Sequence, residues 1–214
     1  AANPSTFSDL AGMTDILVSC AYPIRTRSAG LTQDTDWMDQ ATSAVKDAKP
    51  VWWWVQAYEW EGDGRILPTA AQERCMTYLT LIHGVKGFLY FSYDQMKREE
   101  TPALWNSFKG LTAELEQLAP VILAPTPKQE IRVSPGDSPL HYLLKEHEDK
   151  TYVFAANPGT ERVKATFELP KLKKGCKISV VFEEREAPAI TAGSFADVFE
   201  GYGVHIYRIE RSQE

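Results

Sequence analysis

Two carboxylates, Glu59 and Asp94, each follow an apolar segment rich in aromatic residues. Glu59 comes directly after Lys49–Tyr58, which reads Lys-Pro-Val-Trp-Trp-Trp-Val-Gln-Ala-Tyr, and Asp94 comes shortly after Gly87–Ser92. Such segments are typical of buried strands. If the strands are parallel neighbours, the acids could serve glycoside hydrolysis, which needs a nucleophile and an acid/base. The plainer interpretation is that the Trp-rich segment is only core and each acid is a solvated turn residue.

Aromatic side chains accompany these acids at the ends of the expected strands. Aromatic rings can stack on the apolar C–H faces of sugar rings, or they can simply cover the rim of a sheet. We predict the first role for Tyr22, Tyr58, Trp60 and Tyr93.

Gln56 is the polar residue best placed on the Trp-rich strand itself. Alternation puts it on the same face as Trp52 and Trp54. A glutamine at the mouth of a site donates and accepts hydrogen bonds but is not a nucleophile. We therefore count Gln56 as a substrate-binding candidate, and with it the alternative that the protein binds sugar without cleaving it.

The first part of the chain alternates strands and helices. Helical spacing of apolar residues predicts a helix over Asp34–Asp47, capped by Asp34 or Thr35, and another over Pro102–Leu118. Thr69 and Gln72 predict a capping box that starts a helix ending near Gly84. With strands at Asp15–Cys20, Val51–Ala57 and Gly87–Ser92, this order predicts three βα units with a parallel sheet.

The composition changes at Ala119–Pro127, where three prolines predict a linker or a domain edge. Six or seven short strands follow, two of them joined by a turn at Glu148-Asp149-Lys150, and they predict an antiparallel β-sandwich. The fold class is therefore α/β plus all-β, with one domain at residues 1–119 and a second at residues 120–214. The other strands are expected at Glu130–Val133, His141–Glu146, Thr151–Ala156, Val163–Leu169, Lys177–Phe182 and Val204–Ile209.

The composition of the chain restricts the classes of partner and cofactor that we expect. The formal net charge of −6 argues against nucleic acid and anionic membrane surfaces as partners. No apolar run is long enough to span a bilayer. The three cysteines are far apart and no zinc-binding spacing is present, so we predict neither metal nor cofactor. The compartment is left open: we expect a soluble protein, which could be secreted or periplasmic with a signal removed.

Three βα units cannot close a barrel, since a (β/α)8 barrel needs eight strands. An open three-stranded parallel sheet leaves its edges unpaired. We therefore expect either a homo-oligomer that shares strands between copies, or a missing N-terminal half of a barrel.

The order of elements resembles the C-terminal part of clan-A-like bacterial glycoside hydrolases. Asp15–Ile24 is similar to their sixth barrel strand, Lys49–Trp60 to the seventh, and Cys75–Tyr93 to the last helix and eighth strand, while Ser194–Arg208 resembles the end of the following sandwich. The resemblance implies that Glu59 is the nucleophile. The chain departs from the pattern at Ser19-Cys20-Ala21, where an Asp often precedes the Tyr-Pro pair. It also lacks the fourth-strand segment that usually carries the acid/base Glu.

The resulting hypothesis is a partial (β/α)8 barrel followed by a β-sandwich, acting on a β-linked polysaccharide or oligosaccharide. Glu59 and Asp94 are its candidate retaining carboxylate pair. The alternative is a non-catalytic carbohydrate-binding or structural module that completes its barrel by self-association.

Overall fold

The computed structural model describes residues 3–46, 48–60, 66–96, 99–127, 131–170, 172 and 175–210. The chain divides into two compact units, which we describe separately. Unit 1 comprises Ala1–Leu111 with Pro158–Thr160, and unit 2 comprises Thr112–Asn157 with Glu161–Glu214. The division falls inside a helix, whereas the sequence places the domain boundary at 119/120, which remains a prediction.

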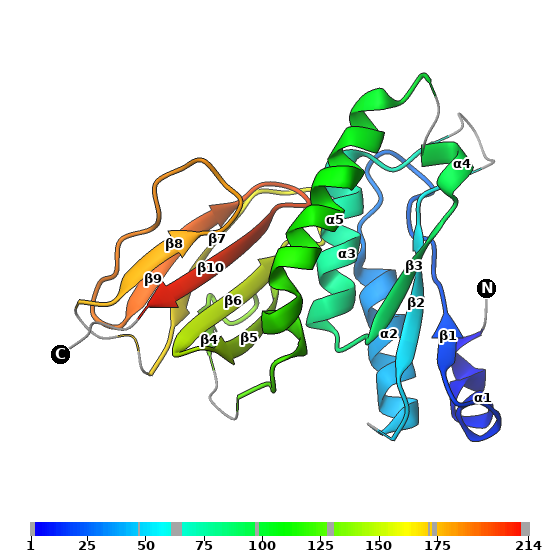
Figure 1. Cartoon of the computed structure of the whole chain (residues 1–214), viewed down its shortest axis with the longest axis horizontal. Coiled ribbons are helices and arrows are strands. Elements are labelled where there is room, and N and C mark those ends of the chain that lie inside the picture. Colours follow the sequence, from blue (N-terminus) through cyan, green and yellow to red (C-terminus); the bar gives the residue numbers. More distant parts are fainter. Residues whose placement is uncertain are drawn as a thin grey trace. The chain divides into compact units, whose positions relative to one another are not determined.

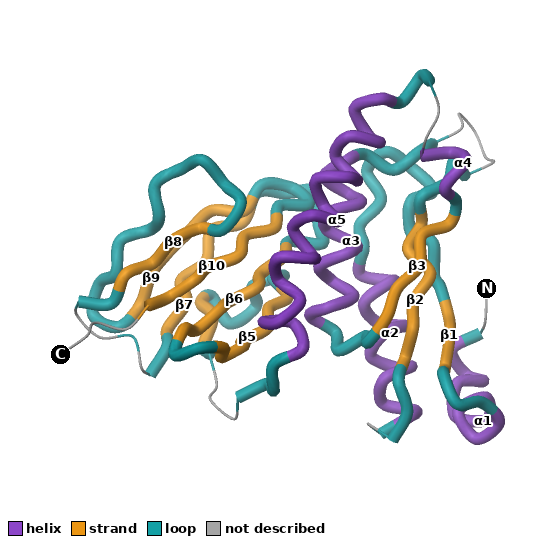
Figure 2. Tube along the Cα trace, in the orientation of Figure 1, coloured by secondary structure: helices purple, strands orange, loops and turns teal. Residues whose placement is uncertain are grey.

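Unit 1 is built on a three-stranded sheet in the order β1-β2-β3, with both strand pairs parallel and helices between the strands (Figures 1 and 2). The parallel arrangement predicted from the alternation of strands and helices is present. The elements are the strands β1 (Leu17–Ser19), β2 (Val51–Gln56) and β3 (Gly87–Phe91), the 3-10 helix η1 (Pro4–Thr6), and the helices α1 (Phe7–Met13), α2 (Thr32–Val45), α3 (Ala70–Ile82) and α4 (Tyr93–Met96). The first part of helix α5 (Pro102–Leu123) also belongs to this unit, and the helix continues into unit 2.

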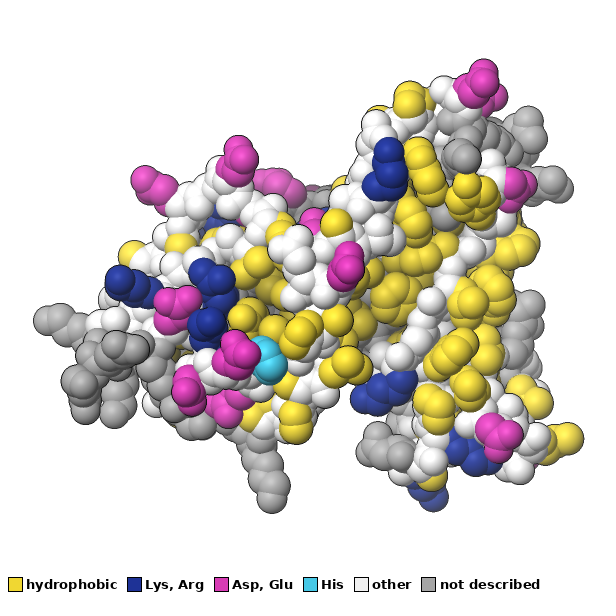
Figure 3. Space-filling model, in the orientation of Figure 1, with side chains coloured by type: hydrophobic (Ala, Val, Ile, Leu, Met, Phe, Trp, Pro, Cys, Tyr) yellow, Lys and Arg dark blue, Asp and Glu magenta, His cyan; other side chains and the backbone are white. Residues whose placement is uncertain are grey.

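The two faces of this sheet differ in burial. On one face, which α2 and α3 cover, Trp53 and Val55 are fully buried. On the opposite face Val18, Trp52 and Phe91 keep 41%, 37% and 45% of their surface exposed. Hydrophobic side chains gather along β2 and β3 in Figure 3. The sheet thus has an apolar face that the described part of the chain leaves partly open to solvent.

Polar side chains form hydrogen bonds at or near the ends of α1, α2 and α3. Thr69 and Gln72 form the predicted capping box at the start of α3. The predicted caps of α2 are wrong, because α2 begins at Thr32, and Asp34 is instead a buried acceptor for the Trp53 indole N–H at 2.9 Å. At the end of α1, the Lys49 ammonium donates to two carbonyl oxygens at 2.6 and 2.7 Å. These bonds satisfy backbone groups that a helix end leaves unpaired.

The predicted linker at Ala119–Pro127 is wrong in its first half. Helix α5 runs through Pro120 to Leu123, and Leu118 and Val121 are buried on either side of the proline. The free energy gained by burying these residues exceeds the cost of the backbone hydrogen bond that a proline removes from a helix interior.

Unit 2 contains two antiparallel sheets that share one hydrophobic core. One has the order β5-β6-β10-β8 and the other β4-β7-β9. Phe167 and Phe195 stack with centroids 5.0 Å apart in that core, against Val153 and Tyr207 of the other sheet. The strands are β4 (Arg132–Ser134), β5 (His141–His147), β6 (Lys150–Ala156), β7 (Val163–Glu168), β8 (Lys177–Val180), β9 (Ser194–Phe199) and β10 (Val204–Glu210).

The predicted hairpin turn is confirmed. Glu148 and Asp149 both have positive φ, 47° and 60°, between β5 and β6, as a two-residue hairpin connection of this hand requires. Of the predicted first strand, Glu130 lies outside the described residues.

Candidate functional site

The carboxyl ends of β1, β2 and β3 bring three aromatic rings together. Tyr22, just after β1, meets Tyr58, just after β2, edge to face with centroids 5.2 Å apart. Both contact Phe91 at the end of β3, at 6.1 and 5.3 Å. The pKa values of both tyrosines are raised, chiefly by burial. Because parallel strands end at one edge, residues far apart in sequence form one cluster there.

Trp60 extends this cluster. Its ring lies 6.1 Å from that of Tyr58, and the guanidinium carbon of Arg25 lies 4.6 Å over the Trp60 ring. This is a cation–π distance. One face of Trp60 is therefore occupied by Arg25. Arg25 could not be singled out from local sequence, because the contact joins two loops that are distant in the chain.

Gln56 is buried, with 1% of its surface exposed, and its amide is fully engaged with Ile24. The side-chain oxygen accepts from the Ile24 N–H at 2.8 Å, and the side-chain nitrogen donates to the Ile24 carbonyl at 2.8 Å. This two-point clamp fixes the loop after β1. Two residues earlier in this loop, Tyr22 has a φ of 56°, which is uncommon for a bulky residue.

The two candidate carboxylates lie on neighbouring segments. The Glu59 N–H donates to the side-chain oxygen of Gln95 at 2.6 Å, and Gln95 follows Asp94 in α4. The loop after β2 therefore touches the helix after β3. Glu59 is half-buried and Asp94 is exposed.

Tyr93 takes a different position from the other predicted aromatics. It is 56% exposed, and its ring meets Trp105 of α5 edge to face at 5.4 Å. Trp105 stacks in turn on Phe108 at 6.0 Å. The structure thus brings Tyr22, Tyr58 and Trp60 together, while the ring of Tyr93 packs against Trp105 of α5.

Two acids that the sequence did not mark as unusual are buried in unit 1. Burial raises the pKa of Asp34 to about 7, although the hydrogen bond from Trp53 acts in the opposite direction. Burial also holds the pKa of Glu73 well above its usual range. Among the described residues, neither carboxyl oxygen of Glu73 has a hydrogen-bond partner. Both acids are therefore favoured in the neutral form.

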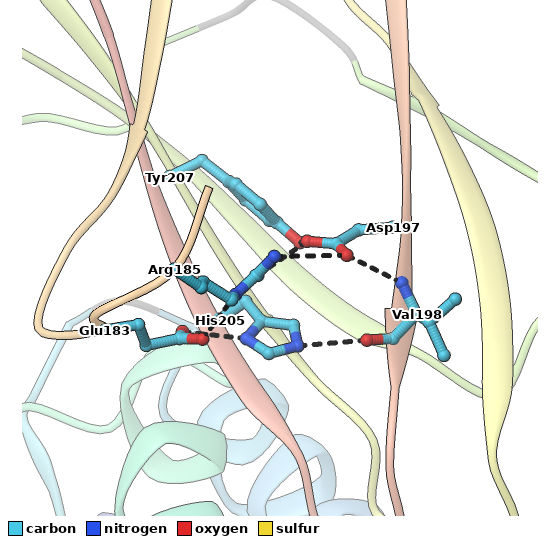
Figure 4. A network of polar contacts seen from close by, with 6 residues as sticks. All are labelled: Glu183, Arg185, Asp197, Val198, His205 and Tyr207. Carbon is cyan, nitrogen blue, oxygen red and sulfur yellow. Dashed lines mark hydrogen bonds and ion pairs between the residues drawn. The ribbon is translucent and has the colours of Figure 1, made fainter. Parts of the chain in front are cut away.

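Unit 2 holds a polar network of its own (Figure 4). Arg185 lies between Glu183 and Asp197, at 2.7 and 2.6 Å, and the Tyr207 hydroxyl donates to Asp197 at 2.8 Å. His205 contacts Glu183 through Nδ1 at 2.7 Å and the Val198 carbonyl through Nε2 at 3.1 Å.

This network ties the segment after β8 to β9 and β10. Burial alone would raise the pKa values of Glu183 and Asp197. Hydrogen bonds from His205 and Arg185, and from Arg185 and Tyr207, outweigh that effect and lower them. Because each polar group in it is satisfied by another, we interpret the network as a stabilising cross-link.

Two surface hollows of unit 2 are lined by residues outside this network. One of about 500 Å³ is lined by residues that include Arg132 and Glu168, and one of about 650 Å³ by residues that include Cys176 and Ile190. The residues that line these two hollows include none of the site residues predicted from the sequence. In the described part of the chain, no group of three or more His, Cys, Asp or Glu residues could hold a metal ion. No helix described there is long and apolar enough to cross a membrane.

Comparison with solved structures finds glycoside hydrolases. An alpha-amylase from Geobacillus thermoleovorans, complexed with acarbose, is similar over 99% of this chain and 58% of its own, with a TM-score of 0.56 and 9% identity. Eubacterium rectale Amy13B matches over 99% and 52%, with a TM-score of 0.53 and 12% identity. A GH30 endoxylanase from Clostridium papyrosolvens C71 matches over 94% and 50%, with a TM-score of 0.50 and 13% identity.

Comparison of the sequence finds no matching protein-family model and no matching curated protein. At 9–13% identity, the structural likeness establishes the fold alone. The chain spans roughly half the length of these solved structures. It therefore has the fold of a part of a glycoside hydrolase, with a mixed helix and sheet unit and antiparallel sheets.

Proposed function

We propose that this chain is a carbohydrate-acting part of a glycoside hydrolase-like protein, with its site at the carboxyl edge of β1–β3. The observation that carries the proposal is the cluster of Tyr22, Tyr58 and Trp60 at that edge, beside Glu59, on a fold like that of glycoside hydrolases. Sites of parallel α/β folds lie at this edge.

In this proposal β1–β3 are three adjacent strands of a (β/α)8 barrel, and the two sheets of unit 2 form a β-sandwich. The apolar face that carries Val18, Trp52 and Phe91 supports the barrel, because such a face becomes core when further strands close over it. Those strands come either from a second copy of the chain or from an N-terminal half of a barrel.

Within the site, each group has a proposed role. The aromatic cluster supplies apolar surface for sugar rings. Glu59 attacks the anomeric carbon, and Asp94 is the acid/base partner within the chain. Gln56, whose amide is occupied by Ile24, contributes by fixing the loop after β1 rather than by contacting the sugar.

The proposal also includes the type of glycosidic linkage on which the protein acts. We propose a β-linked polysaccharide or oligosaccharide, as the sequence resemblance implies. The structural neighbours include alpha-amylases as well as an endoxylanase, so the fold favours neither linkage.

The test of catalysis is the Glu59→Gln variant, which is nearly isosteric and removes the charge. With aryl β-glycosides, we expect hydrolysis by the wild-type chain and a loss of at least about 100-fold in the variant. Asp36→Gln, on the exposed surface of α2, is the matched control and should leave the rate unchanged. Hydrolysis that persists in Glu59→Gln removes Glu59 from the mechanism. Sugar binding without hydrolysis by the wild-type chain favours the non-catalytic binding module.

A further inference from the structure

The Arg25 guanidinium is fixed in its place beside the aromatic cluster. Its carbon atom lies over the Trp60 ring, 4.6 Å from the ring centroid, which is a cation–π distance. Its charge also acts on the neighbouring Tyr58, where it opposes the rise in pKa caused by burial. A guanidinium carries five N–H donors in a planar fork whose geometry matches a carboxylate.

The backbone that presents Arg25 is fixed as well. Ile24, directly before it, is fully buried and is held at both its N–H and its carbonyl by the buried Gln56 amide. The Arg25 N–H donates to the Pro23 carbonyl at 2.9 Å. Arg25 itself is exposed, so its side chain meets solvent at the edge where the candidate site lies, while the Trp60 contact and the buried Ile24 hold it in position. Holding a side chain in advance lowers the entropy lost on binding.

Arg25 brings a positive charge to an edge where the predicted site residues carry none. Tyr22, Gln56, Tyr58, Glu59, Trp60, Tyr93 and Asp94, the predicted site residues, include two acids and no base. Among the described residues, no ion pair joins the Arg25 guanidinium to a carboxylate. Because the chain has a formal net charge of −6, an anionic ligand needs a local cation to bind here.

We propose that Arg25 recognises the carboxylate of an acidic sugar, so that the site takes a saccharide containing uronic acid residues. This inference rests on the proposed carbohydrate site and adds the substrate class. The ring of the sugar lies against the aromatic cluster, and its carboxylate accepts two parallel hydrogen bonds from the guanidinium fork. Carboxylate and guanidinium have matching planar geometry, and such bidentate pairs are the strong class of hydrogen bond.

The experiment compares two ligands that differ only at C6: cellotetraose and its oxidised counterpart, the β-1,4-linked tetramer of glucuronic acid. Isothermal titration calorimetry on the wild-type chain should give an affinity for the oxidised ligand about 10-fold or more higher at low salt. The advantage should shrink as salt rises, because exposed charge pairs are screened.

Variants separate charge from packing. Arg25→Met keeps an apolar stem over Trp60 and should abolish the preference for the oxidised ligand, while Arg25→Lys should retain only part of it. Arg27→Met removes a charge from the same exposed loop without an aromatic contact and should retain the whole preference. The ratio of the two affinities is the readout, so that a general loss of binding does not mimic loss of recognition.

Each other outcome has a definite meaning. Equal affinity of the wild-type chain for both ligands overturns the role of Arg25 and leaves the proposed carbohydrate site standing. A preference that survives in Arg25→Met also overturns it. Equally tight binding of a sulfated cello-oligosaccharide would show a contact with charge alone and would overturn the carboxylate assignment. Binding of none of these ligands overturns the proposed function together with this inference.

Discussion

Two residues in unit 1 have structural roles that their residue type alone does not predict. Gln56 looks like a ligand contact on a strand, yet both ends of its amide are bonded to Ile24, which lies 32 positions earlier. Asp34 looks like a helix cap, yet it is buried against Trp53. Both assignments depend on a loop or strand that is distant in sequence, so local pattern could not supply them. In each case a polar group is buried because one specific partner satisfies it.

Asp34 should make unit 1 less stable as pH rises. Its pKa is about 7 in the folded chain against roughly 4 when unfolded, so the folded state keeps the proton longer. The stability that the neutral form provides is complete below about pH 4 and is lost as pH rises to about 7. Asp34→Asn keeps an acceptor for the Trp53 indole and cannot ionise. We expect its unfolding free energy to exceed that of the wild type by about 2–4 kcal/mol at pH 8, with little difference at pH 4.

Chemical denaturation at the two pH values measures this difference. Asp36→Asn, on the exposed side of the same helix, is the control and should track the wild type at both. If Asp34→Asn differs from the wild type by the same amount at pH 4 and pH 8, ionisation of Asp34 is not the cause.

At the scale of elements, local chemistry predicted the start of α3 and one hairpin turn, but not the start of α2. The capping box of Thr69 and Gln72 and the turn at Glu148-Asp149 need only neighbouring residues, and both are present. Helix α4 was not predicted, because four residues give no periodicity, and α5 passes through Pro120 because burial of its neighbours overrides a local signal. The aromatic cluster could be anticipated from parallel strand ends. The contact of Tyr93 with Trp105 could not, because it depends on where α5 lies.

The pairing of β2 and β3 depends on Gly87. This glycine is the register partner of Trp52, and a Cβ at position 87 would lie 2.8 Å from the Trp52 indole nitrogen. At that distance the Trp52 ring would have to shift to admit the methyl group of alanine. We expect Gly87→Ala to lower the unfolding free energy by about 1–3 kcal/mol, the range for overpacking.

The matched control for this change is Gly110→Ala. A Cβ at position 110, on the exposed side of α5, meets nothing within 4 Å. Alanine is the better helix former, so stability should rise by about 0.5–1 kcal/mol. Thermal or denaturant unfolding of the two variants gives the comparison. Gly87→Ala with unchanged stability would mean that Trp52 does not occupy the space over Gly87.

At the scale of the whole molecule, the partly exposed apolar face of β1–β3 favours association with another protein surface. We predict that the isolated chain self-associates through it, because exposed apolar patches and open strand edges favour pairing. Val18→Glu places a charge on this face and should shift the mass measured by light scattering towards 24.1 kDa. Met13→Glu, at an exposed position at the end of α1, should leave association unchanged. A wild-type chain that is monomeric at micromolar concentration would exclude self-association.

The central claim is that carbohydrate binds unit 1 at the edge where β1, β2 and β3 end. Hydrogen-exchange mass spectrometry with and without a saturating saccharide tests it directly. The account predicts slower exchange in peptides covering residues 20–26 and 56–60, with no change in the unit 2 strands at residues 177–180 and 194–210. Protection confined to unit 2, or unchanged exchange at residues 20–26 and 56–60 under conditions where calorimetry detects binding, would contradict it.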